Sequence, residues 1–571
     1  MTHGRAKPCP RARRHLLLLA AAALALLARP GAGAAQTPDA RLGERIYREG
    51  VLPSGETVRA SMQGDLTVEG TQLNCAGCHR RSGFGSSEGA AYVPPVTGAA
   101  LYRGKEASVA DNFRRLFQEV QPAQLRARLR DPRPRPAYTD ESLAVALREG
   151  RDPAGRELDP LMPRYRLSDE DAGHLAAYLK SLSASPAPGV SASAVHFATV
   201  VAEGAGPEKR RALLDVMRAY FRWKNADTAG MLRRSDSTVW YEEELPATYR
   251  EWVLHVWELK GAPATWPAQL DAYYKGRPVF ALLGGAGEGS WRPVHDFCER
   301  EGVPCLFPDT ELPADAGAYT LYLSGGLAVE AGALARHLRE RDWPAGAKRV
   351  VQVYRDGGGG PVLARALARE LRGRGAPELR ERVIRGSQRL TPAFWKEVLE
   401  AERPRVLVLW LGEADLTTLD AARPAADAVA EIYLSFGLLR ETPRRALQNL
   451  RERVYLTYPY ALPSPESPHV YRVRAWLRAR GVAPADERLQ LNTHFALSVA
   501  DHALTRMAGN FSRDYFVEAV EQETETALNP GVFPRLSLGP GQRFASKGSY
   551  IVRPSGRAPG GLEPASRWII P

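Results

Sequence analysis

The sequence predicts a multidomain protein in which a small all-α domain precedes a larger, two-lobed α/β domain built on parallel sheets. Three observations lead to this prediction. The 571-residue chain is too long for a single hydrophobic core. A stretch rich in Ser, Pro, Ala and Gly at 181–193 has the composition of a linker. Capped helical patterns precede it, whereas strands alternate with helices after it. The predicted boundaries are 36–182, 183–194 for the linker, and 195–571.

Composition and charge narrow the class of protein. Apolar residues make up 44% and charged residues 25%, as in ordinary soluble globular proteins. The formal charge of +12 includes six cationic residues before position 30, a region without acids, so the rest of the chain carries an excess of about +6. This mild excess gives no indication of nucleic-acid binding, and it suits docking onto an acidic protein partner.

Residues 1–35 have the pattern of a secretory signal peptide. Arg11, Arg13 and Arg14 precede an apolar run at 16–28, and small residues follow up to Ala35. The run is shorter than the roughly 17 residues that span a bilayer. No later stretch is apolar enough to span one, so we expect a periplasmic protein with no transmembrane segment after cleavage.

The first domain is expected to consist of helices and loops. Helical spacing covers 39–49 and is expected again at 111–120. Two further helices open at Thr139 and Ser168, each a good N-cap followed by acids in the first turn. No short internal repeat is evident.

The strongest chemical signal is Cys75-Ala76-Gly77-Cys78-His79. Two thiols that can add to the vinyl groups of a porphyrin, with a His directly after the second, are the pattern of covalent c-type haem attachment. A zinc knuckle would need a second Cys pair or more His nearby, and a thioredoxin-type CxxC has no support here. The motif predicts one covalent haem c.

Few residues of this domain could be the sixth ligand of the haem iron. Met62 and Met162 are the methionines of this domain, and Met162 lies in a Pro-flanked loop between two helices, where its side chain is free to face a cofactor. His174, on the last predicted helix, is a weaker alternative. A loop Met filling an apolar gap is the ordinary interpretation of such a residue.

Residues 40–182 resemble class I c-type cytochromes in a first helix with Gly43 and Tyr47, the CxxCH motif, Pro94-Pro95, and the run from 158 to 182. The resemblance implies that His79 and Met162 are the axial ligands and that the carbonyl of Pro94 or Pro95 orients His79. The sequence departs from a minimal cytochrome in its long stretch at 51–74 and in a basic run at 126–135. That run is either a solvated face or a patch that docks a partner or faces the haem propionates.

The second region alternates strands and helices, which predicts βαβ units and parallel sheets. Two glycine-rich loops follow strand ends, at 284–290 and 356–360, where open α/β sheets bind ligands. Neither has the sequence of a Walker A loop or of a dinucleotide fingerprint. The predicted strands are 195–201, 252–257, 279–283, 303–307, 320–323, 350–354, 406–411, 432–435 and 454–458.

This region resembles type 1 periplasmic binding proteins of the leucine/isoleucine/valine-binding kind, through the strand, small-residue loop, helix and strand at 279–308 and the strand and helix at 348–375. The resemblance implies two lobes that close on a small molecule. Its first-lobe candidates are Gly284, Gly285 and Ser290, with Trp291 and Tyr354 as walls of the site.

Cys298 and Cys305 form either a disulfide or two separately buried thiols, and the sequence leaves both possibilities open.

The sequence is compatible with three functions for the whole chain. The first is non-enzymatic electron transfer between a dehydrogenase and a respiratory acceptor. The second is a ligand-binding or sensory protein whose haem reports binding. The third is a catalytic haem enzyme, which would need an exchangeable iron site.

Overall fold

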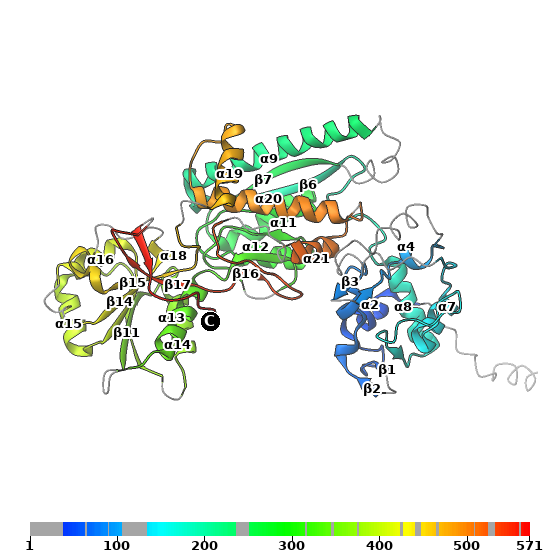
Figure 1. Ribbon diagram of the computed structural model, residues 1–571, viewed down its shortest axis with the longest axis horizontal. Helices are drawn as coiled ribbons and strands as arrows, with labels where there is room; N and C mark the ends of the chain where they lie inside the picture. The colour runs from blue at the N-terminus through cyan, green and yellow to red at the C-terminus, as the bar shows by residue number, and fades with distance from the viewer. Residues whose placement is uncertain are drawn as a thin grey trace, which may run out of the picture. The chain divides into compact units, whose positions relative to one another are not determined.

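The computed structural model divides the chain into two compact units, 1–182 and 183–571 (Figure 1). The structure describes residues 38–571 except 63–65, 89–90, 106–133, 236–249, 315–316, 344–347, 374–375, 423–425, 427, 440–446, 464–466, 508, 524–530 and 559–560. The predicted signal peptide and the predicted helix at 111–120 therefore lie outside the described residues. Among the residues described, no helix combines the length and the apolar character needed to cross a membrane.

Helices dominate the small unit, as predicted, and short strands that the sequence analysis did not find join them. Its helices are α2 (Ala40–Glu49), α3 (Cys75–His79), α4 (Gly98–Leu101), α7 (Asp140–Glu149) and α8 (Asp169–Ser181). Its strands are β1 (Arg59–Met62), β2 (Leu66–Glu69) and β5 (Arg164–Tyr165), in the order β2-β1-β5, with a separate hairpin of β3 (Ser86–Glu88) and β4 (Ala91–Val93). Thr139 and Ser168 cap α7 and α8 through capping boxes, as their sequences predict.

The first and last helices, α2 and α8, cross in close contact. A Cβ placed on Gly43 would lie 2.0 Å from the carbonyl oxygen of His174, so only glycine permits this approach. One turn further along, the rings of Tyr47 and Tyr178 pack with centroids 5.4 Å apart. The crossing joins the two ends of the unit and encloses its core.

An internal repeat links the two halves of this unit. The pattern Arg-Glu-Gly-x-x-Pro-x-Gly occurs at 48–55 and at 148–155, each time at the end of a ten-residue helix. Gly50 and Gly150 both adopt the left-handed conformation, and their carbonyls accept equivalent hydrogen bonds from Val58 N (2.9 Å) and Leu158 N (2.8 Å). Met62 and Met162 follow at corresponding positions, which makes them a matched pair.

The large unit contains two sheets, one in each lobe. The first lobe has the order β16-β10-β9-β8-β6-β7 and the second β12-β11-β13-β14-β15-β17-β18, parallel apart from β17 and β18. The chain crosses between the lobes three times, after β10, β15 and β16. The strands are β6 (Ala194–Ala202), β7 (Glu251–Leu259), β8 (Ala281–Leu283), β9 (Cys305–Leu306), β10 (Thr320–Ser324), β11 (Arg349–Arg355), β12 (Glu378–Ile384), β13 (Val406–Trp410), β14 (Glu431–Ser435), β15 (Val454–Tyr458), β16 (Phe544–Ser546), β17 (Tyr550–Pro554) and β18 (Leu562–Pro564).

Helices cover both faces of each sheet, because the central strands are apolar on both sides. In the first lobe α9 (Gly206–Ser235), α20 (Glu487–Met507) and α21 (Arg513–Glu523) share one core with the sheet, and α11 (Trp266–Gly276) and α12 (Arg292–Glu301) share the other. In the second lobe α15 (Pro392–Glu402) and α16 (Glu413–Asp420) lie opposite α13 (Leu327–Glu340) and α14 (Gly360–Glu370) (Figure 1). Helix α19 (Pro468–Ala479) precedes α20.

Part of the predicted linker is fastened to the large unit. Ala187 N donates to Phe511 O (2.9 Å), and the guanidinium of Arg513 donates to Pro188 O (3.2 Å). At Gly189, which has φ +88°, an added Cβ would lie 2.2 Å from Phe280 N. Residues 187–189 therefore belong structurally to the first lobe.

Candidate haem attachment site

The CxxCH motif forms the one-turn helix α3. Its N-cap is Asn74, whose side chain accepts a hydrogen bond from Gly77 N (2.7 Å) and donates one to Thr71 O (2.7 Å). The helix brings both thiols and the imidazole together within five residues. His79 is 7% exposed, whereas Cys78 is exposed.

The ring of His79 is fixed by a backbone carbonyl. Its Nδ1 lies 2.9 Å from Pro94 O, so Pro94 rather than Pro95 holds the imidazole. Burial lowers the pKa of His79, and the Pro94 hydrogen bond opposes this in part. A neutral imidazole with Nδ1–H bonded to a carbonyl leaves Nε2 as the metal-binding nitrogen.

Close backbone packing places the Pro94 carbonyl. Gly85 N donates to His79 O (3.1 Å), and a Cβ on Gly85 would lie 2.1 Å from Val93 O. On the other side, Tyr47 OH donates to Arg80 O (2.6 Å), where the chain turns at φ +65°. Helix α2 and the segment before Pro94 thus fix the residues on either side of His79.

Met162 lies in a loop that polar contacts hold in place. Met162 N donates to Asp159 O (2.9 Å), and the guanidinium of Arg164 donates to Met162 O and to Leu158 O (3.2 Å for the latter). The next residue, Tyr165, donates its hydroxyl to Leu73 O (2.9 Å), just before the CxxCH helix. The hydrogen bond from Tyr165 therefore joins the Met162 loop to the segment just before the haem motif, although the two are far apart in the sequence.

The methionine pair and Cys75 lie around one core. Met62, Met162 and Cys75 are partly buried and pack against the same hydrophobic cluster. The thiol of Cys75 contacts the Tyr165 hydroxyl, and burial raises the pKa of the Cys75 thiol to about 12. Two thiols for covalent attachment, an imidazole oriented to bind iron and a methionine thioether on the same core fit a covalent haem c.

His174, the weaker candidate for the sixth ligand, lies at the crossing of α2 and α8. Its Nδ1 accepts a hydrogen bond from Asp39 N (2.8 Å) at the start of α2, and its ring is 2% exposed within the helix crossing.

Of the basic run at 126–135, residues 126–133 lie outside the described residues. Arg135 is described, and its guanidinium donates to Ala100 O (2.6 Å) and Leu101 O (3.2 Å), which gives it a structural role.

In the large unit, the predicted ligand residues lie at or after the carboxyl ends of separate strands. Gly284 and Gly285 follow β8 with φ values of 57° and 125°, and Ser290 forms a β-bridge with Leu312. Tyr354 is near the end of β11 and its hydroxyl donates to Glu381 (3.3 Å). Trp291 is 1% exposed and packs in the lobe core under Gly285, so it does not present a wall to solvent.

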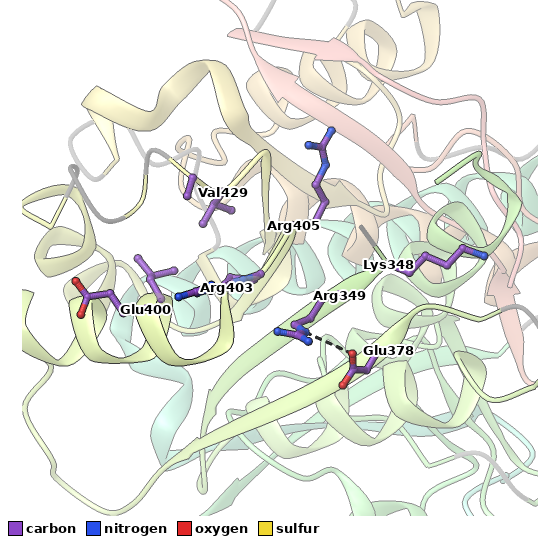
Figure 2. Close-up of a pocket in the computed structure, with 10 residues that line it drawn as sticks. Lys348, Arg349, Glu378, Glu400, Arg403, Arg405 and Val429 are labelled. Atoms are coloured by element: carbon purple, nitrogen blue, oxygen red, sulfur yellow. Dashed lines mark hydrogen bonds and ion pairs between the residues drawn. The ribbon is translucent and has the colours of Figure 1, made fainter. Parts of the chain in front are cut away.

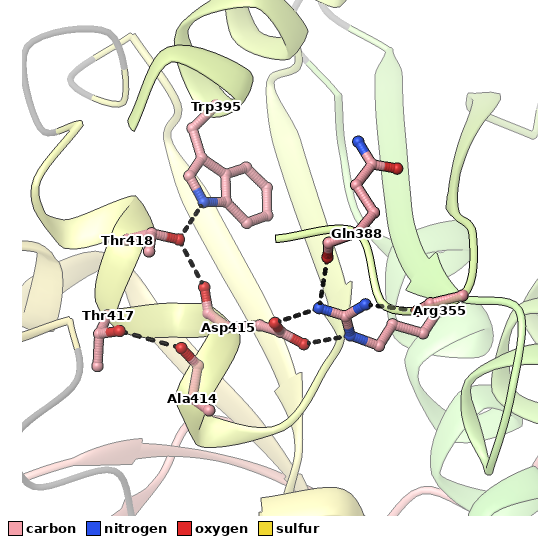
Figure 3. Close-up of polar contacts among 8 residues, drawn as sticks. Arg355, Gln388, Trp395, Ala414, Asp415, Thr417 and Thr418 are labelled. Carbon is pink, nitrogen blue, oxygen red and sulfur yellow. Dashed lines mark hydrogen bonds and ion pairs between the residues drawn. The ribbon is translucent and has the colours of Figure 1, made fainter. Parts of the chain in front are cut away.

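An ion pair that the sequence analysis missed lies at the same edge of the second lobe (Figure 3). Arg355 binds Asp415 through two hydrogen bonds of 2.6 and 2.8 Å, and it also donates to the carbonyls of Gly386 and Gln388 at 3.1 Å. This pair joins α16 to the loop after β12. The sequence shows only a single Arg at the end of a strand, and this does not indicate that its partner is Asp415, far along the chain.

A cavity of about 780 Å³ lies elsewhere, at the amino ends of β11, β12 and β13 (Figure 2). Lys348, Arg349, Arg403 and Arg405 surround it, and Arg349 pairs with Glu378 at 3.4 Å. Figure 2 shows the cationic groups pointing in different directions rather than converging. It is distinct from the strand ends where the ligand residues were predicted.

Residues 69–183 match the family model for cytochrome c, which confirms the resemblance of the small unit. No curated protein matches the chain. Similar solved structures include a fatty acid ABC transporter substrate-binding protein from Thermomonospora curvata (15% identity, 68% of this chain and 95% of that one, TM-score 0.47). Others are a leucine-binding protein from Thermotoga maritima (15%, 66% and 99%, 0.43) and a solute-binding protein from R. palustris in complex with benzoate (11%, 66% and 97%, 0.46).

Proposed function

We propose that the protein is a periplasmic, non-enzymatic one-electron carrier with a single covalent haem c in its small unit. The observation that carries this proposal is the capped CxxCH helix with His79 buried and its Nδ1 held by Pro94 O at 2.9 Å. Cys75 and Cys78 would form the two thioether bonds, His79 would bind the iron through Nε2, and Met162 would be the sixth ligand.

The haem, when bound, supplies an iron that alternates between two oxidation states. The residues around the haem would hold the same two iron ligands in place in both oxidation states. The Pro94 carbonyl fixes the orientation of the imidazole and increases its basicity. Arg164 and Tyr165 anchor the Met162 loop, and a methionine sulfur raises the reduction potential. With both His79 and Met162 bound, the iron would have no open position for substrate, which favours electron transfer over catalysis.

The partner would be a redox protein, a dehydrogenase or a respiratory acceptor. The mild positive charge of the chain suits an acidic docking surface, and the rate of electron transfer should then fall as salt is added. A signal peptide at 1–35 would supply the export route that covalent haem attachment and a periplasmic location both require.

The test is an optical study of the purified, haem-loaded protein. The oxidised form should show the weak far-red band of methionine-ligated haem, and the reduced spectrum should not change under carbon monoxide. Ready binding of carbon monoxide would show an exchangeable sixth position. That result would overturn the electron-carrier proposal and favour a sensory or catalytic haem.

A second candidate is a sensory protein whose haem reports ligand binding. It is favoured by the two-lobed unit, with the loop at Gly284 and Gly285 and the loop after Tyr354 at the strand ends of different lobes. This candidate is tested by a thermal-shift screen with amino acids, small carboxylates and alcohols, in which a compound that binds should raise the unfolding temperature. A hit that also shifts the haem potential would support sensing, whereas no response to any compound would favour a docking role for this unit.

A further inference from the structure

Cys298 and Cys305 lie against each other in the core of the first lobe. Cys298 is on α12 and Cys305 is the first residue of β9, and both side chains are 0% exposed. Both belong to the same buried cluster of the lobe, and the Cys305 thiol is close enough to raise the pKa of the Cys298 thiol. The sequence left open whether these residues are paired or separate, and the structure brings them together.

The backbone on both sides holds this contact. Gly302, with φ +58°, caps the C-terminus of helix α12, and Val303 N donates back to Cys298 O (2.9 Å) in a tight C-terminal turn. Cys305 then enters the centre of the sheet, where it aligns with Leu282 on β8 and Thr320 on β10. The helix end and the strand start are therefore both fixed, at positions that face each other.

We propose that Cys298 and Cys305 form a disulfide in the exported protein, which covalently closes α12 onto β9. This inference rests on the periplasmic location in the proposed function. The two thiols lose two protons and two electrons as one S–S bond forms. The acceptor is an oxidised thiol–disulfide oxidoreductase, whose own disulfide breaks and takes up the two protons and two electrons as a pair of thiols.

The bond would form while the lobe is folding, since neither sulfur is exposed afterwards. Burial raises the pKa of the Cys298 thiol, and contact with Cys305 raises it further, so the folded core disfavours the thiolate that exchange requires. A disulfide there is a structural bond and not a switch. It also removes two thiols from competition with Cys75 and Cys78, which must stay reduced until haem is attached.

Peptide mapping of the exported, haem-loaded chain tests this directly. Under denaturing, non-reducing conditions the free thiols are alkylated with iodoacetamide, and the chain is then cut with trypsin. Cleavage after Arg300 separates the two cysteines into peptides 276–300 and 301–336, because Pro follows Arg277 and Arg292 and blocks cleavage there. The expected result is one linked species that splits into these two peptides only after reduction.

Two separate peptides, each carrying an alkylated cysteine before reduction, would overturn the disulfide. Haem content is read from the absorption of the same sample, so a loss of haem counts against the proposed function while the peptides decide the disulfide. Cys298→Ala, Cys305→Ala and the double variant give a second test. Each single variant should lower the unfolding temperature equally and the double variant no further, whereas additive losses would indicate two independent thiols.

Discussion

Glu330 is predicted to make the large unit less stable as the pH rises from acid to neutral. Its carboxylate is 1% exposed on α13, where it accepts hydrogen bonds from Ser435 Oγ (2.9 Å), Gly437 N (3.1 Å) and Thr457 Oγ1. Burial is the largest influence and raises the pKa of Glu330 from an ordinary 4.5 to about 7, although the three donors oppose it. Glu311 raises this pKa further.

The direction and size of the effect follow from this difference in pKa. The folded chain holds the Glu330 proton more tightly than the unfolded chain. The stability from this group is thus complete below pH 4.5 and is lost as the pH rises through about 7. At about 1.4 kcal/mol for each pKa unit, the loss amounts to about 3 kcal/mol.

The assay is urea unfolding at pH 5 and pH 8, followed by tryptophan fluorescence. Glu330→Gln keeps the shape of the side chain without its charge, and it should reduce the pH dependence of the unfolding free energy by about 2–3 kcal/mol relative to the natural chain. The matched control is Glu340→Gln, on the same helix but exposed beside Arg336, which should keep the natural dependence. Identical dependence in Glu330→Gln and the natural chain would refute the reasoning.

Two more predictions concern the small unit. Met162→Leu should abolish the far-red band and lower the haem midpoint potential, as spectroscopy and potentiometry would show. Met62→Leu, at the corresponding position of the repeat, should leave both the band and the potential unchanged. A band that survives in Met162→Leu would exclude Met162 as a ligand. Gly43→Ala should destabilise the unit by about 2–3 kcal/mol, because the new Cβ meets the His174 carbonyl at 2.0 Å. Gly173→Ala, with nothing nearer than 3.7 Å, should instead stabilise it by about 0.5–1 kcal/mol, and equal thermal shifts in the two variants would contradict the packing argument.

The haem motif could be predicted because its chemistry is contained in five adjacent residues. The role of Pro94 rather than Pro95 could not, since it depends on the approach of Gly85 to the chain before Pro94. Tyr165 was missed for a similar reason. Its hydroxyl donates from strand β5 to Leu73 O, a contact between segments that are far apart in the sequence.

In the large unit, buried strands were predicted because they are continuous apolar runs. Strand β12 was missed because Glu378–Ile384 is mostly charged, as an edge strand can be. Trp291 was expected beside a ligand because it follows a glycine-rich loop, but the glycines themselves allow its ring to pack beneath them. Glu330 could not be singled out from the sequence, since burial by other segments leaves no mark in the residues next to it.

The internal repeat also escaped detection. The shared residues lie at the helix ends and in the turns that follow, and they include Gly50 and Gly150, the left-handed glycine after each helix. The flanking helices differ in sequence, so the repeat is confined to the short pattern at 48–55 and 148–155, and the hydrogen bonds show that its two turns are equivalent in structure.

The central claim is that this chain carries one haem, bound covalently through Cys75 and Cys78. Intact-mass measurement of the denatured, exported protein tests it most directly. The account predicts the mass of the polypeptide after signal cleavage plus one haem, and the loss of that addition in a Cys75→Ala, Cys78→Ala variant. A polypeptide without added mass, or one with more than one haem, would contradict it.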